Sequence, residues 1–396
     1  MWGDEAALVF KRCILSIRLC SCLNSYFLEW NGKTGSAYPA SRWHQISYQI
    51  HTLVCTFVIQ PILCIRCYQL RGELNSDPGH VCIAYVIAAL LAVALPFMWY
   101  FVWRERSYEF IESYESVSDV HKFMEELSPR NKKFKLQLIE TNFADLCAQS
   151  ITYGIPVIIS FVCIFCYDFN PVYTFLRDAT NFESTIFKVS LYTGTAIFSC
   201  ISLTVALLIN AIGLFAVANG IIVLYMWSLR FHELLLDLRF DELVKMYKNL
   251  RVMCIIQEGL ARDLIAPCLH HFILVTEATA ALHYFLRQFM PGGQVSYLAS
   301  VVAVVLIGLG FVYETFAIRF VADAGSAGKR LKREMITRYG STRYKRKVLG
   351  TLLPNCINLE FISSVDTIHN GIGMDYFIRY VERVVNQTLG LLLTVD

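Results

Sequence analysis

Apolar stretches long enough to cross a lipid bilayer recur along the chain, separated by polar segments. A helix needs about 20 apolar residues to span a hydrocarbon core of roughly 30 Å. The pattern predicts seven spans, near residues 46–68, 81–103, 148–168, 187–228, 264–286, 297–318 and 376–395. The predicted fold class is therefore all-α: a polytopic membrane protein with an N-terminal segment, 1–45, followed by one seven-helix transmembrane domain, 46–396.

The basic residues are distributed unevenly between the connections, and their distribution predicts the orientation. The N-terminal segment and the connections 104–147, 229–263 and 319–360 together hold 28 Lys and Arg. The opposite connections hold only three, which are Arg71, Arg177 and Arg287. Because connections rich in Lys and Arg stay in the cytosol, we expect a cytosolic N-terminus and an extracellular C-terminus.

The stretch from Phe187 to Trp227 is long enough for two short crossings or for one helix that continues beyond the bilayer. A single crossing keeps the basic connection 229–263 in the cytosol, whereas two crossings would not. Within 229–262, leucines and methionines recur at helical spacing with charges between them. We therefore expect long helices that project into the cytosol and pack there. The alternative is a helix that lies on the membrane surface.

The composition agrees with a membrane protein and excludes several other classes. The 396 residues are 56% hydrophobic and 17% charged, with a mean hydropathy of +0.47, whereas soluble domains have about 25% charged residues. A net charge of +3 is too small to indicate nucleic-acid binding. The sequence shows no histidine boxes, nucleophile motif or metal-ligand spacing. We therefore expect neither an enzyme nor a bound cofactor.

The last span carries many polar side chains for a membrane helix. Four of them recur every four residues, and so share one stripe of a helix: Asp375, Arg379, Arg383 and Gln387. Such a stripe avoids lipid and faces protein or water. One stripe cannot enclose a water-filled path, but several copies around a symmetry axis can, so we expect an oligomer with this helix at its centre. Alternatively, the arginines reach the inner headgroups and Asn386 and Gln387 bond a neighbouring helix.

The chain thus combines a cytosolic N-terminus, seven spans, short outer and long basic inner connections, and an end close to the last span. In this it resembles the arthropod chemoreceptor superfamily, the gustatory and odorant receptors. Gustatory receptors usually end in Thr-Tyr, five hydrophobic residues and Gln-Phe. Thr388, Leu389, residues 390–394, Val395 and Asp396 fall in the same register, where the Thr and the apolar filling match. Leu, Val and Asp replace the Tyr, Gln and Phe, so topology and length carry most of the resemblance.

The resemblance implies a chemosensory, gustatory-type receptor in the plasma membrane that acts as a ligand-gated, non-selective cation channel. It implies a homotetramer, or a heterotetramer with related subunits, whose pore is lined by the last helix of each subunit. Its partners would be a small-molecule tastant or odorant, permeating cations and membrane lipid. We predict four pore or gate residues: Gln387, Leu391, Val395 and Asp396. Val395, or Leu391 one turn below, would close the pore by dewetting, and the Asp396 carboxylates would concentrate cations.

The ligand pocket implied by the resemblance lies in the outer halves of spans two to six. Aromatic walls with a few polar groups are typical of small-molecule pockets, and these halves supply Tyr85, Phe161, Phe165, Tyr192, Glu277, His283, Tyr284 and Tyr297. An acid within a span is costly unless it is paired or lines a wet cavity. Glu277 would therefore bind a polyol or an amine, or be satisfied by Thr276 and His283. The aromatic residues are alternatively core or interfacial residues.

Two other functions fit parts of the pattern. A metabotropic seven-helix receptor of reversed topology would bind a G protein through the basic inner connections and would have no pore. A transporter would show inverted repeats or paired broken helices, and the sequence shows neither. Among these alternatives, the polar last span favours a channel.

Overall fold

A computed structural model of the chain describes residues 10–18, 25–72, 78–127, 157, 160, 170–180, 184–235, 238–264, 270–289, 297–353, 355 and 375–393. The first half contains the strands β1 (Leu28–Asn31) and β2 (Ser36–Pro39), then α2 (Arg42–Val54), one π-helical turn η1 (Cys55–Ile59), α3 (Gln60–Gly72), α4 (Pro78–Tyr100) and α5 (Arg104–Leu127). The second half contains α8 (Pro171–Thr180), α9 (Thr185–Leu234), α10 (Phe240–Leu264), α11 (His270–Arg287), α12 (Tyr297–Tyr339), α13 (Arg343–Thr351) and α15 (Asp375–Leu393).

Helices make up nearly all of the described chain, which confirms the prediction of a helical protein. The one exception among the described residues is the hairpin of β1 and β2, which the sequence pattern does not predict. In its turn, the Asn31 side chain accepts a hydrogen bond from the backbone N–H of Lys33 at 2.9 Å, and Gly35 adopts a φ of 68°. Four-residue strands are too short to show a clear period of two.

Three of the described helices are long and apolar enough to cross a membrane: Arg42–Leu70, Ile83–Tyr100 and Thr185–His232. They coincide with the first, second and fourth predicted spans. The fifth, sixth and seventh predicted ranges are occupied by α11, α12 and α15, whose crossing of a membrane stays a prediction. The third predicted range, 148–168, lies largely outside the described residues.

The helix α9 is one unbroken helix of 50 residues, which confirms a single element over the fourth stretch. At about 1.5 Å per residue it is roughly 75 Å long, more than twice the thickness of a hydrocarbon core. It packs against α4, α8, α10 and α12. A Cβ atom on Gly213 or Gly220 would overlap Phe97 of α4 or Gln257 of α10. Glycine at these two positions lets the helices approach closely.

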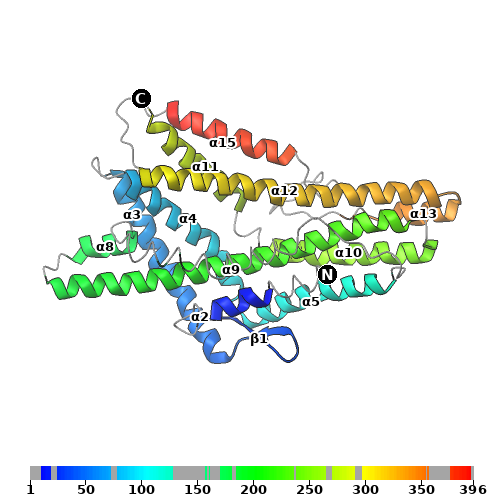
Figure 1. Cartoon of the computed structure of the whole chain (residues 1–396), viewed down its shortest axis with the longest axis horizontal. Helices are drawn as coiled ribbons and strands as arrows, with labels where there is room; N and C mark the ends of the chain where they lie inside the picture. The colour runs from blue at the N-terminus through cyan, green and yellow to red at the C-terminus, as the bar shows by residue number, and fades with distance from the viewer. Residues whose placement is uncertain are drawn as a thin grey trace.

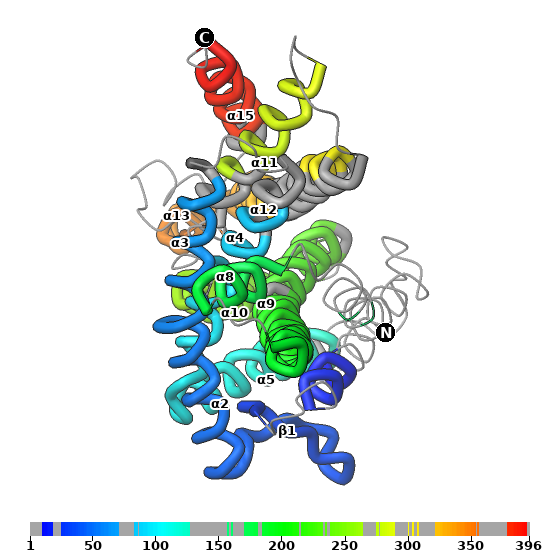
Figure 2. The backbone as a smooth tube through the Cα atoms, turned by 90° about the vertical axis from the view of Figure 1, so that its left-hand side faces the viewer, coloured from blue at the N-terminus to red at the C-terminus, as the bar shows by residue number. Residues whose placement is uncertain are grey.

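The ends of the described helices lie toward opposite ends of the molecule. Figure 1 shows the end of α3, α8, the starts of α9 and α12 and the end of α15 on the left, and α5, α10 and α13 towards the right. We call these the outer and inner ends, after the predicted sides of the membrane. Figure 2, viewed from the left of Figure 1, shows α15 at one extreme of the molecule and the β1 hairpin at the other. This arrangement is compatible with the predicted seven-span topology, which stays a prediction.

The helices at the inner end pack on one another. α10 packs against α5 and α9. Its completely buried side chains include Leu243, Met246, Leu250 and Met253. These belong to the stripe that the spacing within 229–262 predicts. Trp227 of α9 donates a hydrogen bond from Nε1 to Nδ1 of His121 of α5 at 2.9 Å. The stripe is therefore protein core, as expected for helices that pack beyond the bilayer.

Candidate functional site

The helix α15 lies at the edge of the molecule and has few neighbours among the described elements (Figures 1 and 2). It packs against α11 and, less extensively, against α12. Tyr380 and Val384 are buried against Val275 and Ala278 of α11, and they form a small core separate from the main one. Thr388, one further turn along, is also buried. These α15 residues are four apart, so one narrow stripe attaches the helix.

The neighbouring stripe of α15 is the polar one predicted from the sequence, and it is exposed. Every member with a described side chain is exposed in the single chain: Arg379, Arg383, Gln387 and Leu391. Leu389 and Leu393 are also exposed, by 51% and 77%. A helix with the length of a membrane span thus leaves both charged and large apolar side chains uncovered. Within the described chain, the buried side chains of this helix lie on one stripe: Tyr380, Val384 and Thr388.

Two of the four predicted pore residues can be placed. Oε1 of Gln387 accepts a hydrogen bond from Oγ1 of Thr279 of α11 at 3.3 Å. Leu391, one turn further along, is 43% exposed. Val395 and Asp396 lie outside the described residues. The pore and gate roles of all four residues stay predictions.

The predicted ligand residues are distributed over α4, α9, α11 and α12. Tyr85 of α4 is 44% exposed, while three others are half-buried: Tyr192 of α9, and His283 and Tyr284 of α11. Glu277 and Tyr297 belong to α11 and α12, where the structure describes their backbone only, and Phe161 and Phe165 lie outside the described residues. Because these helices meet at the outer end, the structure is compatible with one shared site, which stays a prediction.

The short helix α8, which the sequence does not predict, packs on the first turns of α9. Oδ1 of Asn170 accepts a hydrogen bond from the N–H of Val172 at 3.1 Å and so caps α8. Nδ2 of Asn170 donates to Ser199 of α9 at 3.2 Å. The ring of Tyr173 meets Tyr192 edge to face, with 5.8 Å between centroids. One predicted ligand residue therefore lies beneath α8.

A buried arginine joins α8 to α3. The Arg66 side chain is only 9% exposed, and its Nη2 lies 3.1 Å from Oδ2 of Asp178. A guanidinium is costly to bury unless it is paired. The ion pair therefore stabilises α8 in its position at the outer end.

The outer end of α11 carries a polar group that sequence reasoning missed. Gln288 is 7% exposed, and its Oε1 accepts a hydrogen bond from Oγ of Ser300 of α12 at 2.6 Å. Its Nε2 is buried without a hydrogen-bond partner, as is Nε2 of His283. A glutamine at the end of a span is an ordinary residue in the sequence. Only the packing of α11 on α12 shows that it is buried.

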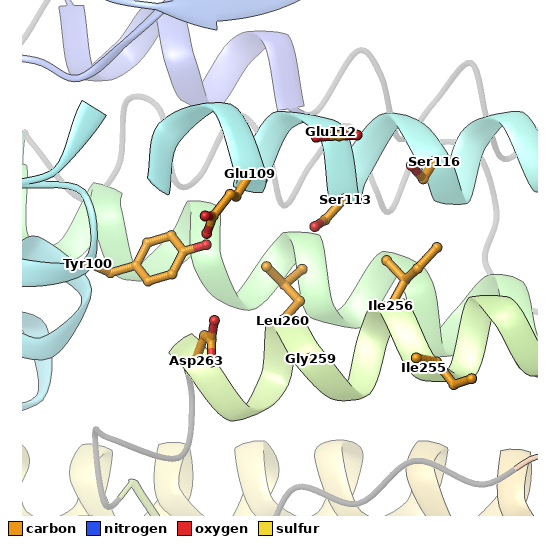
Figure 3. Close-up of a pocket in the computed structure, with 10 residues that line it drawn as sticks. All are labelled: Tyr100, Glu109, Glu112, Ser113, Ser116, Ile255, Ile256, Gly259, Leu260 and Asp263. Atoms are coloured by element: carbon orange, nitrogen blue, oxygen red, sulfur yellow. The ribbon is translucent and has the colours of Figure 1, made fainter. Parts of the chain in front are cut away.

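A concave region lies between α5 and α10, at the inner end of the molecule (Figure 3). It is an open pocket of about 390 Å³ that includes Tyr100, Glu109 and Asp263 in its lining. Nη1 of Arg106 lies 2.7 Å from Oε2 of Glu109 and 3.1 Å from Oδ2 of Asp263. The hydrogen bond to Glu109 raises the pKa of Arg106. Arg106 thus pairs with two acidic residues of the lining, Glu109 and Asp263, and these side chains form a structural ion-pair network.

Comparisons with known proteins give matches among solved structures. No protein-family model matches the chain, and no curated protein matches its sequence. Among solved structures, the insect olfactory receptor OR5 from Machilis hrabei, in complex with eugenol, aligns over 100% of both chains with a TM-score of 0.51 and 11% sequence identity. This likeness shows the fold of the chain, and it supports the resemblance to arthropod chemoreceptors at the level of the fold. The neighbour is a receptor and not an enzyme, in line with the expectation for this chain.

Proposed function

We propose that the chain is a chemosensory receptor of the plasma membrane that works as a ligand-gated, non-selective cation channel of the gustatory type. Four copies, or this chain together with related subunits, surround a pore lined by α15. The observation that carries the proposal is the exposed polar stripe of α15, at the edge of a chain with the fold of an insect olfactory receptor. In the single chain, the side chains of Arg379, Arg383 and Leu391 are exposed, and Gln387 contacts Thr279 of α11.

The physical reason is the cost of exposing this stripe to lipid. An arginine costs about 2.5–3.5 kcal/mol at the centre of a bilayer on insertion scales, and reaches the headgroups when it lies near a helix end. Arg379 and Arg383 lie in the inner half of the predicted span 376–395, and both are exposed. Turning the stripe toward a symmetry axis shared by several copies places it against water and the other copies. Rows of residues spaced i, i+4 are inclined by about 26° to a helix axis. The row through Gln387, Leu391 and Val395 would therefore line a straight pore if α15 were tilted by about that angle.

The predicted orientation, with the N-terminus in the cytosol and the C-terminus outside, has support from packing near the N-terminus. Phe10 stacks on Tyr114 of α5, with 4.2 Å between ring centroids. Residues 104–127 of α5 belong to the first predicted inner connection. A segment packed on that connection lies on the same side of the membrane, so a cytosolic α5 requires a cytosolic N-terminal segment.

The ligand in this proposal binds at the outer end, among α4, α9, α11 and α12. The aromatic and polar side chains there suit a small, largely apolar molecule with a few polar atoms. The similar olfactory receptor is in complex with eugenol, so a small aromatic compound is a reasonable first probe. Sugars, polyols and amines are included because Glu277 lies on α11.

The test is whole-cell current from cells that express this chain alone, before and during application of eugenol, other volatile organics, sugars and amines. We expect ligand-evoked cation current, and we expect Val395→Ala to leak without ligand because the dewetted constriction is widened. Leu393→Ala is the matched control, because Leu393 is an apolar residue near the same helix end, outside the row of Gln387 and Leu391. A surface-expressed chain that signals through a G protein without any current, in wild type and Val395→Ala alike, would contradict the channel.

A further inference from the structure

Gln288 occupies an unusual electrostatic position for a neutral side chain. It is 7% exposed, and one of its two polar atoms, Nε2, is buried with no hydrogen-bond partner. Buried amide groups are nearly always hydrogen-bonded, because an unpaired donor loses its contacts with water and gains nothing. Gln288 therefore presents an unused donor inside the outer end of the molecule.

The orientation of this donor is fixed by the neighbouring helix. Oγ of Ser300 of α12 donates to Oε1 of Gln288 at 2.6 Å, which is a short hydrogen bond. The bond holds the carbonyl side of the amide toward α12, so Nε2 is directed away from Ser300. A donor held in this way loses little conformational entropy when an acceptor binds.

The surroundings of Gln288 indicate the kind of molecule that would use the donor. Phe285 and Phe289 lie on either side of it in the sequence, and their rings meet edge to face with 5.3 Å between centroids. Tyr284 and Glu277 lie on one face of α11 by register, and Gln288 follows directly after the last residue of that helix, Arg287. The unpaired donor is therefore at the end of the helix that carries two predicted ligand residues, within an aromatic segment.

We infer that Gln288 is a specificity-determining residue of the ligand site and donates a hydrogen bond from Nε2 to an acceptor oxygen of the ligand. The inference rests on the proposed function and refines it. The ligand class is a small aromatic or largely apolar molecule that carries a carbonyl or ether oxygen. Ser300 is a positioning residue, because it acts by orienting the amide and does not contact the ligand.

The opposite side of α11 contacts α15 and provides a route by which binding would reach the last helix. Val275 and Ala278 pack against the buried stripe of α15, and Thr279 bonds Gln387. The helix that carries the donor is thus the same rigid element that holds α15. A ligand that tightens the contact between α11 and α12 at Gln288 would shift α11 relative to α15.

The experiment measures binding directly, so that it does not depend on channel opening. The purified full chain in lipid nanodiscs is titrated by calorimetry with acetophenone and with α-methylstyrene, in which a CH₂ group replaces the carbonyl oxygen at nearly the same shape. We expect the wild type to bind acetophenone about tenfold more tightly, the effect of one satisfied hydrogen bond in a buried site. Gln288→Met should abolish this preference, and Ser300→Ala should reduce it.

Two further variants separate recognition from folding. Gln49→Met, at a glutamine of α2 that bonds a backbone carbonyl near the start of α5, should leave the preference unchanged. If Gln288→Met does not fold, the double variant Gln288→Met with Ser300→Ala removes both partners of the hydrogen bond and leaves neither unpaired. Its thermal midpoint should be close to that of the wild type, and its preference should be lost.

The outcomes distinguish the inference from the proposed function. Three results would overturn the role of Gln288. These are equal binding of the two probes by the wild type, an equal loss of affinity for both probes in Gln288→Met, or no binding of either probe. None of these results depends on current, so a channel opened by other compounds would survive them. Conversely, a preference for acetophenone that requires Gln288, in a chain without any current, would support the site and contradict the channel.

Discussion

The inner end of the molecule and α15 differ in how far a single chain covers its own apolar surface. At the inner end, α5, α9 and α10 enclose large side chains such as Trp227, Phe231 and Tyr247, each no more than 2% exposed. On α15, two buried apolar residues contact α11, while Leu393 remains 77% exposed. The first region is complete within one chain, whereas the second requires lipid, other copies or both.

Because of this difference, substitutions that lower stability and substitutions that impair function are expected to fall in different regions of the molecule. A packed core loses several kcal/mol when one large side chain is truncated. An exposed apolar residue loses little stability in the single chain, and its effect arises in the assembly. Substitutions at the two regions should therefore move different measurements.

The largest effect is expected from Leu250→Ala in α10. Leu250 is completely buried, so removing its side chain leaves a cavity and should cost about 2–5 kcal/mol of unfolding free energy. Chemical denaturation of the purified protein in detergent, followed by circular dichroism, measures this change. The matched variant Leu393→Ala on α15 should change the unfolding free energy by less than about 0.5 kcal/mol.

Comparable losses of unfolding free energy in both variants would contradict this difference between the two regions, because they would show that α15 is as well packed as the inner end. A tetramer population that decreases in Leu391→Ala, with unchanged subunit stability, would support this difference, because Leu391 is exposed on the row that is proposed to face the symmetry axis. Mass photometry of nanodisc-embedded protein measures that population.

The next largest effect is expected at the close contact between α9 and α10. A Cβ atom at Gly220 would lie 1.9 Å from Cδ of Gln257, so Gly220→Val should destabilise the inner end by about 1–3 kcal/mol through overpacking. Adding Gln257→Ala should restore part of the lost stability, because it makes space for the valine side chain. Additive losses in the double variant would show that the two helices do not meet at this point. Thermal unfolding of the four combinations measures the coupling.

The sequence was sufficient to predict those elements whose signal is local and long. The basic residues after Trp227 predicted that α9 is one element, and its 50 unbroken residues confirm this. The spacing of Leu243, Met246 and Leu250 predicted a buried helical face, which α10 has. In both cases the pattern repeats over many residues, so a chance deviation at one position does not obscure it.

The elements that the sequence did not predict depend on single contacts between distant residues. α8 is ten residues long, and its position depends on Asn170 with Ser199 and on Arg66 with Asp178. The buried state of Gln288 likewise depends on Ser300 of another helix. Such pairs leave no period in the sequence. Val395 and Asp396, which are predicted to line the pore, lie outside the described residues, so their assignment rests on the resemblance.

A smaller effect is expected where the two regions are connected to each other through α11. Thr279→Val removes the hydrogen bond to Gln387 while keeping the shape of the side chain, and one such bond contributes about 0.5–1.5 kcal/mol. We expect a severalfold shift in the ligand concentration for half-maximal current, and a decrease in unfolding free energy of no more than about 1.5 kcal/mol. Thr388→Val is the control, because the Thr388 hydroxyl bonds only the Val384 carbonyl of its own helix. An equal shift in both variants would show that the contact between Thr279 and Gln387 does not couple ligand binding to α15.

The smallest effect is expected from Glu115 of α5, within the region that the single chain completes. Burial, followed by the charge of Asp119, raises the pKa of the Glu115 carboxyl above its ordinary value. A raised pKa in the folded state stabilises the protein at a pH below the pKa of the unfolded chain, about 4.3. This contribution is lost as the pH rises through the folded-state pKa. At neutral pH, Glu115→Gln should therefore unfold at a slightly higher temperature than the wild type, and the difference should disappear near pH 4. Ser116→Ala, which removes no titrating group, should show no such dependence on pH. A difference between Glu115→Gln and wild type that grows as the pH falls would have the opposite sign and would place Glu115 in a stabilising ion pair.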